Sequence, residues 1–316
     1  MKMFEMETYK IFGDQEHSLI EMTLGDLLDK VASVYPENDC VVCNDKPFRK
    51  TYKEFKEECD TVAKGLMALG VEKGSHVAIW ATNYPEWIVL MYASAKIGAT
   101  LVTVNTNYKV FEAEYLLKQS DTDTLVMMEG LKDTNYTEII NELCPELKTS
   151  TPGSMDCENL PYLKRVIYLD SKEKTPQGML HWSELHKLSE KISDDELRAR
   201  QASVDCHDVV NMQYTSGTTG FPKGVMLTHY NILNNGKCIG DNQIFTYRDR
   251  VCLPVPFFHC FGCVLGIMAC ITHGSTIVPV ERYNPVRVMN TIQGERCTAT
   301  YGVPTMYIAM LEHPDF

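Results

Sequence analysis

The sequence has no excess of positive charge. Its 316 residues include 30 Lys and Arg against 42 Asp and Glu, which gives a formal net charge of -12. Because a protein that binds nucleic acid needs a basic surface to face the phosphates, this balance argues against a general nucleic-acid binder. A few backbone amides and one Lys can still bind a small anion within an acidic protein.

The chain also lacks the apolar leader of a secreted protein and an unbroken hydrophobic run. Its first residues, MKMFEMETYKIFGD, contain no apolar segment typical of a signal peptide. The longest uncharged run, 251–280, has the length of a membrane span, but Pro254, Pro256 and Gly262 interrupt its first half. The run therefore predicts a buried core segment. We expect a cytoplasmic protein with no transmembrane segment and at most peripheral contact with a membrane.

Twelve cysteines are present, but their spacing forms neither a disulfide framework nor a complete metal site. Several stand in apolar surroundings, among them Cys252 and Cys297, which predicts reduced core thiols. Cys260 and Cys263 have CxxC spacing and adjoin His259. No further His/Cys pair at ligand spacing follows them, so a structural zinc is the less favoured interpretation.

Helix and strand patterns alternate along the chain. Short apolar runs predict strands at 76–81, 100–105, 124–128, 165–170, 209–214, 276–281 and 297–302. Capping residues and apolar periodicity predict helices after Thr23, after the Thr51–Glu54 capping box, from Pro85, over 111–120 and 193–201, after Asn284, and from Pro304. The polar stretch 145–164 predicts a long surface loop. This βαβα order favours an α/β fold with a largely parallel sheet covered by helices.

The stretch YTSGTTGFPKG, residues 214–224, follows an apolar strand and has little side-chain bulk. Three glycines permit a close backbone approach, so that successive amides can converge on an anion: Gly217, Gly220 and Gly224. Four hydroxyl side chains can add donors: Thr215, Ser216, Thr218 and Thr219. Lys223 adds a mobile positive charge. This density of donors favours a polyphosphate-binding loop over a flexible surface turn.

The loop does not match the Walker A pattern. That pattern requires Gly-Lys-Ser/Thr after four spacer residues and opens a helix. Here Lys223 follows Pro222 and precedes Gly224, and the next residues, VMLT, predict a strand. A P-loop ATPase or GTPase is therefore disfavoured.

The segment YTSGTTGFPKGVMLTHYN resembles the signature phosphate loop of the adenylate-forming superfamily of acyl-CoA synthetases, peptide adenylation domains and luciferases. Other segments resemble the family in the family's order: LMALGVEKGSHVAIWATNYPEW (66–87), AKIGATLVTVN (95–105), PVPFFHCFG (254–262) and TYGVPTMYIAML (300–311). Within the superfamily, VPFFHCFGCVLG looks most like the fatty-acyl-CoA synthetases of medium or long chain preference.

The resemblance implies a two-step ligase reaction. A carboxylate attacks the α-phosphate of ATP to give acyl-AMP and pyrophosphate, and the thiol of CoA then displaces AMP. ATP and Mg²⁺ are the implied cofactors, and the fatty acid and CoA are the implied partners. By resemblance, Thr215 to Gly220 hold the phosphates and Thr215 is a candidate Mg²⁺ ligand. Lys223 steers the departing pyrophosphate, and His259 stands at the entrance to the acyl site. Phe257, Phe258 and Phe261 can line the acyl channel, although aromatic residues at this spacing more often belong to the core, and Gly302–Tyr307 packs near the same channel.

The family's pattern continues with motifs that we do not find here: a Glu that binds Mg²⁺, an Asp that holds the ribose, and a small C-terminal catalytic domain with a Lys. We therefore expect residues 1–316 to form a partial adenylation domain, inactive alone, as the front portion of a synthetase. The resemblance implies two stacked α/β subdomains, one over 72–238 and one over 15–71 plus 239–316. The alternative is a short non-catalytic protein that binds ATP or an acyl group.

Overall fold

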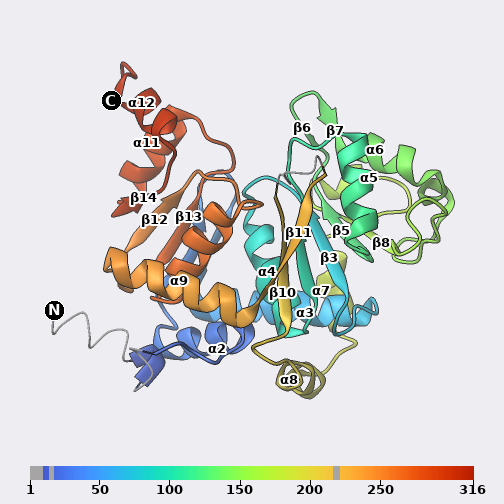
Figure 1. Ribbon diagram of the computed structural model, residues 1–316, viewed down its shortest axis with the longest axis horizontal. Coiled ribbons are helices and arrows are strands. Elements are labelled where there is room, and N and C mark those ends of the chain that lie inside the picture. Colours follow the sequence, from blue (N-terminus) through green and yellow to red (C-terminus); the bar gives the residue numbers. More distant parts are fainter. Residues whose placement is uncertain (1–9, 14–17, 216–220) are drawn as a thin grey trace. The chain divides into compact units, whose positions relative to one another are not determined.

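The computed structural model describes residues 10–13, 18–215 and 221–316 (Figure 1). Residues 216–220, which belong to the predicted phosphate loop, lie outside the described residues. Contacts divide the chain into two units. Unit 1 comprises Met1–Glu58, Thr82–Val89 and His229–Phe316, and unit 2 comprises Cys59–Ala81 and Leu90–Thr228. The subdomain boundaries drawn from the resemblance, 72–238 against 15–71 plus 239–316, stay a prediction.

Unit 2 is built on a seven-stranded sheet in the order β11-β10-β4-β3-β5-β8-β9. The strands are β3 (His76–Trp80), β4 (Thr100–Thr103), β5 (Thr124–Met127), β8 (Arg165–Tyr168), β9 (Leu180–His181), β10 (Val209–Thr215) and β11 (Lys223–Thr228). Neighbouring strands pair in parallel, except that β10 and β11 are antiparallel. The strands β4, β5 and β8 are buried along their whole length, as expected where both faces of a parallel sheet are covered.

The helices α3 (Tyr52–Ala68) and α4 (Pro85–Lys96) begin in unit 1 and end in unit 2. The remaining elements of unit 2 are α5 (Val110–Gln119), β6 (Gly130–Leu131), β7 (Thr134–Asn135), α6 (Tyr136–Leu143), α7 (Glu184–Ser189), α8 (Asp194–Ala202) and the 3₁₀ turns η2 (Pro145–Thr149) and η3 (Lys172–Lys174). The helices α3, α4 and α5 were expected near their observed positions, which supports the α/β class. The 15-residue helix α9 (His229–Gln243) of unit 1 was not predicted.

One expectation about the cysteines is wrong. All twelve lie in the described part of the chain; ten are free thiols, but Cys144 and Cys157 form a disulfide. This bond closes a loop of 13 residues across the polar stretch that follows α6. Neither cysteine stands in a spacing that distinguishes it from the others, so only the folded chain reveals the pair.

Unit 1 is built on a five-stranded sheet in the order β14-β12-β13-β1-β2. Its strands are β1 (Asp39–Cys43), β2 (Phe48–Thr51), β12 (Arg250–Leu253), β13 (Thr276–Pro279) and β14 (Ala299–Thr300). Its helices are α2 (Leu24–Val34), α9 (His229–Gln243), α10 (Ala269–Ile271), α11 (Pro285–Gly294), α12 (Pro304–Leu311) and the π-helix η4 (Phe261–Met268). Only β2 runs antiparallel to its neighbour.

The uncharged run 251–280 supplies β12, η4, α10 and β13. Most of its side chains are buried, with Val251, Cys270 and Ile277 at 0% exposure. In the described residues, we find no helix with both the length and the apolar character of a membrane span. The run is therefore the core of unit 1, as the sequence predicts.

Candidate functional site

The carboxyl end of β10 carries the predicted phosphate loop. Thr215 is the last residue of β10, and it is the ladder partner of Lys223, the first residue of β11. Both residues are exposed. The structure therefore brings together the two ends of the predicted loop, as opposite residues of the strand ladder. Ser216, Gly217, Thr218, Thr219 and Gly220 lie outside the described residues.

Helix α5 supports the exit of this loop. The Tyr115 hydroxyl donates to the carbonyl of Pro222 at 3.1 Å, and the Tyr115 and Phe221 rings lie 5.3 Å apart. The Tyr214 hydroxyl donates to Gln119 at the end of the same helix. A Cβ at Gly224 would lie 3.0 Å from the sulfur of Met212 and 3.2 Å from the Tyr214 ring, so a larger residue beside Lys223 would have to displace these side chains. Burial raises the pKa of the Tyr214 phenol, which therefore stays neutral at physiological pH.

The second predicted segment leaves the carboxyl end of β12. Residues 254–259 follow Leu253, and His259 is exposed. The His259 amide donates to the carbonyl of Pro256 at 3.3 Å, and the amides of Gly262 and Cys263 donate to the His259 carbonyl at 3.0 Å. In parallel α/β sheets, ligands bind at the carboxyl ends of the strands. Each of the two predicted segments occupies such a position in its own sheet.

The hydrogen bonding of the His259 ring assigns its neutral tautomer. The backbone N–H of Phe261 donates to Nδ1 of His259 at 3.1 Å. Because Nδ1 accepts, the proton of the neutral imidazole is on Nε2. An exposed Nε2–H can donate to a carboxylate without placing a fixed charge next to apolar side chains.

The aromatic residues of PFFHCFG divide between core and surface. Phe257 is only 1% exposed and packs against Trp87, with ring centroids 5.6 Å apart, so it belongs to the core. Phe258 and Phe261 are partly exposed. The ring of Phe261, at the start of the π-helix, lies 5.6 Å from that of Tyr301, the residue before the predicted segment Gly302–Tyr307. The expectation that Phe258 and Phe261 line an acyl channel stays a prediction.

His229, the first residue of α9, is buried. Its ring is 0% exposed, and its Nδ1 accepts the N–H of Leu24 at 3.0 Å. It therefore joins the start of α9 to the start of α2, and we assign it to the fold.

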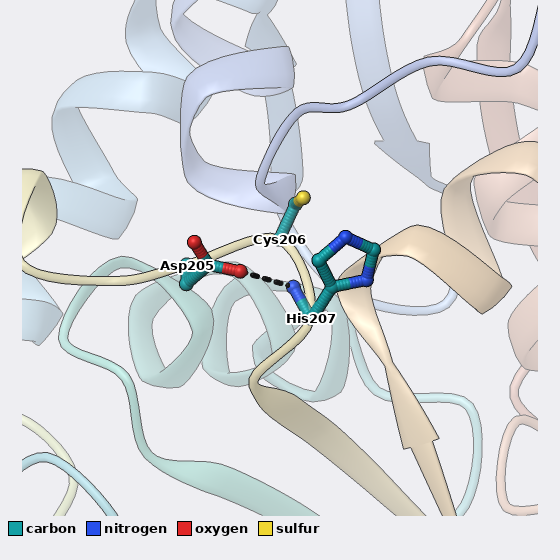
Figure 2. A group of neighbouring side chains, drawn as sticks. All are labelled: Asp205, Cys206 and His207. Carbon is teal, nitrogen blue, oxygen red and sulfur yellow. Dashed lines mark hydrogen bonds between the residues drawn. The ribbon is translucent and has the colours of Figure 1, made fainter.

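A turn before β10 gathers three side chains of metal-ligand type, Asp205, Cys206 and His207, whose ligand atoms lie within 4.8 Å of one another. Figure 2 shows that they leave one short turn on consecutive residues. Oδ1 of Asp205 accepts the backbone N–H of His207 at 2.8 Å, and the neighbouring Asp208 is paired with the ammonium of Lys73 at 2.8 Å. Because these bonds explain the turn without an ion, and because Lys73 disfavours a cation nearby, we assign no metal to this group.

The sequence of the chain matches the family described as AMP-binding enzyme over residues 28–316. The chain belongs to this family. It is 51% identical over 298 residues to a protein named putative acyl-CoA synthetase YngI from Bacillus subtilis (strain 168), covering 94% of this chain and 54% of that protein. It is 35% identical over 309 residues to the medium-chain acyl-CoA ligase ACSF2, mitochondrial, of Homo sapiens, covering 96% of this chain and 50% of that protein.

Solved structures agree with the fold. The chain superimposes on the N-terminal domain of FACL13 from Mycobacterium tuberculosis with a TM-score of 0.72 and 25% identity, covering 94% of this chain and 66% of that one. A long-chain-fatty-acid-CoA ligase (FadD1) from Archaeoglobus fulgidus gives a TM-score of 0.75 at 24% identity, with 93% and 54% covered. The fold is thus that of an adenylate-forming N-terminal domain. The chain spans about half the length of the curated relatives that it matches.

One residue of the site region escaped the sequence reasoning. Asn83 precedes Pro85, where an Asn suggests a helix cap or a turn. Its carboxamide instead binds backbone groups of unit 1 that are 170 to 197 residues distant in the sequence. No local pattern signals a contact of that range.

Proposed function

We propose that this chain is the front portion of an acid–thiol ligase. The enzyme activates a fatty acid of medium or long chain with ATP to acyl-AMP and pyrophosphate, and then transfers the acyl group to CoA. One observation carries the proposal. In a chain of the AMP-binding enzyme family, the ends of a Gly/Thr-rich loop are held together as the Thr215–Lys223 pair at the carboxyl end of β10.

The chemistry explains why such a loop is needed. The attacking carboxylate and the triphosphate are both anions, so the reaction requires donors and positive charge around the phosphates. In the proposal, the amides and hydroxyls of 215–220 bind the phosphates, and Lys223 neutralises the pyrophosphate as it leaves. The exposed hydroxyl of Thr215 is a suitable oxygen ligand for Mg²⁺, which would share this charge when bound.

His259 has the second role in the proposal. In the proposal, the Nε2–H of His259 donates a hydrogen bond to the substrate carboxylate and orients that group for attack. A neutral donor suits an acid with an apolar tail better than a fixed cation does, because the surroundings of the tail have few groups to solvate a charge. The names of the two curated relatives, one an acyl-CoA synthetase and one a medium-chain acyl-CoA ligase, support the acyl class.

The experiment is ATP–pyrophosphate exchange with carboxylic acids from acetate to palmitate, measured on the longest product of the reading frame that encodes this chain. We expect exchange to peak with medium or long fatty acids. Lys223→Ala removes a charged contact to phosphate, so exchange falls by about 10- to 150-fold. The control is Lys187→Ala, because Lys187 is an exposed residue of helix α7 in the same unit and is paired with Glu184.

Three results would count against the proposal. Exchange that is equal in Lys223→Ala and in the unmodified protein would remove the loop from the reaction. A peak at acetate or at aromatic acids would contradict the substrate class. Binding of ATP without exchange for any acid would leave a nucleotide-binding protein that does not turn over.

A further inference from the structure

The carboxamide of Asn83 binds the segment that carries His259. Its side chain is in the core of unit 1, with the residue only 3% exposed. The amide nitrogen donates to the carbonyls of Val255 at 2.9 Å and Val280 at 3.1 Å, and a third carbonyl, that of Leu253, lies at 3.3 Å. The amide oxygen accepts the backbone N–H of Phe257 at 2.9 Å. The Asn83 side chain thus provides a partner for one buried backbone N–H and for the buried carbonyls around it.

These partners mark the ends of two adjacent parallel strands. Leu253 is the last residue of β12, and Val280 directly follows β13. Asn83 also donates its own backbone N–H to Glu281 at 3.4 Å. The carboxamide therefore clamps the first residues of the 254–259 loop to the neighbouring strand, at the carboxyl edge of the sheet.

The hydrogen bonds of Asn83 act on His259 through Phe257, which lies two residues before it in the sequence. Phe257 is fixed on one side by its N–H bond to Asn83 and on the other by its ring, which packs against the fully buried Trp87. The chain then turns, with the His259 N–H donating to Pro256. Nδ1 of the His259 ring accepts the backbone N–H of Phe261, and this hydrogen bond requires the turn at 256–259. Fixing Val255 and Phe257 consequently fixes the direction of the Nε2–H.

No other side chain of similar size can replace the carboxamide. A leucine would leave the Phe257 N–H and the carbonyls of Val255 and Val280 buried without partners. An aspartate would keep the acceptor but would bring a carboxylate oxygen against these carbonyls. The carboxamide of an asparagine has a donor and an acceptor in one planar group, and Asn83 uses both.

We propose that Asn83 is the positioning residue for His259: it holds the 254–259 loop so that the imidazole presents Nε2–H to the carboxylate of the acid substrate. The inference rests on the proposed function for the role of the carboxylate, but the effect of Asn83 on the imidazole is a property of the chain alone. Asn83 does not touch the substrate.

The test measures the ¹⁵N chemical shifts of the two ring nitrogens of His259. The whole chain is labelled with ¹⁵N-histidine, and the His259 ring nitrogens are assigned by their loss in His259→Gln. The unmodified chain is expected to show the Nε2–H tautomer. In Asn83→Ala and Asn83→Ser, both ring shifts are expected to move toward the averaged values of a mobile imidazole, with folding checked by circular dichroism. Asn234→Ala is the matched control. Asn234 also binds distant backbone with its carboxamide, at Ile20, but has no contact with the loop.

Kinetics supply a second readout. In the exchange assay, Asn83→Ser is expected to lower kcat/KM for the acid by about tenfold or more, because a misdirected donor loses near-attack geometry. The KM for ATP is expected to stay unchanged, since the described hydrogen-bond partners of the Asn83 carboxamide are Leu253, Val255, Phe257 and Val280, outside the predicted phosphate loop. A wild-type protein without exchange would overturn the proposed function, while the imidazole shifts would still decide the role of Asn83.

Two outcomes would overturn the inference. The first is a folded Asn83→Ala or Asn83→Ser chain whose His259 shifts equal those of the unmodified chain. The second is a failure of both variants to fold while Asn234→Ala folds, which would make Asn83 a residue of the fold rather than of the site.

Discussion

At the scale of single residues, Asp241 shows how the structure controls a partly buried charge. Its carboxylate in α9 accepts from Lys237 Nζ at 2.7 Å and lies 3.0 Å from Nε2 of His273. The side chains of Lys237 and His273 are 7% and 0% exposed. Burial raises the pKa of Asp241, but the hydrogen bonds from His273 and Lys237 outweigh burial and hold its pKa below the ordinary value of 3.8.

A lowered pKa in the folded state predicts loss of stability in acid. The folded chain binds fewer protons at Asp241 than the unfolded chain does, so this contribution is complete above about pH 4 and disappears as pH falls through the lowered pKa. We expect Asp241→Asn to reduce the free energy of unfolding by about 1 kcal/mol or more near neutral pH, because Lys237 loses its charged partner. The difference from the unmodified chain narrows below about pH 4.

Urea unfolding at a series of pH values measures this difference. The control is Asp195→Asn, since Asp195 is 88% exposed and its pair with Arg198 lies on the surface of α8. A constant difference between Asp241→Asn and the unmodified chain from neutral pH down to about pH 2 would contradict the linkage.

At the scale of elements, local sequence chemistry predicted most helix starts. The Thr23 hydroxyl caps α2. At the start of α3, the Thr51 N–H donates to the Glu54 carboxylate at 2.8 Å and the Glu54 N–H donates to the Thr51 hydroxyl at 3.3 Å. Asn284 caps α11 directly before Pro285. These signals operate within three residues, so they can be read from the sequence. The π-helical winding of 261–268 cannot, because it depends on how that segment packs against β12 and α9.

The π-helix begins at a close backbone contact that gives a prediction. A Cβ at Gly262 would lie 2.3 Å from the carbonyl oxygen of Pro256, in the loop that leads to His259. Since backbone cannot yield as a flexible side chain does, we expect Gly262→Ala to lower the free energy of unfolding by about 1–3 kcal/mol. Gly294→Ala is the matched control, because a Cβ at that helix end meets nothing within 4 Å.

Chemical denaturation of both variants tests this contact. The control is expected to keep or slightly raise the stability of the chain, since alanine reduces the freedom of the unfolded state. Equal stability of Gly262→Ala and Gly294→Ala would show that the Pro256 loop shifts without cost, and it would weaken the view that this loop is rigid.

At the scale of the whole chain, two mostly parallel sheets each carry one predicted site segment at a carboxyl edge. Residues 215–224 follow β10 in unit 2, and residues 254–259 follow β12 in unit 1. The α/β class, most of the strands and both segments could be predicted because apolar runs and glycine-rich loops are local patterns. The strands β2 and β12 and the helix α9 were not predicted. The Cys144–Cys157 bond and the contacts of Asn83 could not, because they join residues that only the folded chain brings together.

The central claim is that the loop bounded by Thr215 and Lys223 binds the phosphates of ATP. Its most direct test is calorimetric titration of Mg·ATP into the unmodified chain, Lys223→Ala and the control Lys187→Ala. We expect Lys223→Ala to weaken binding by about tenfold or more, while Lys187→Ala binds as the unmodified chain does. Equal affinity of all three chains for Mg·ATP would contradict the claim.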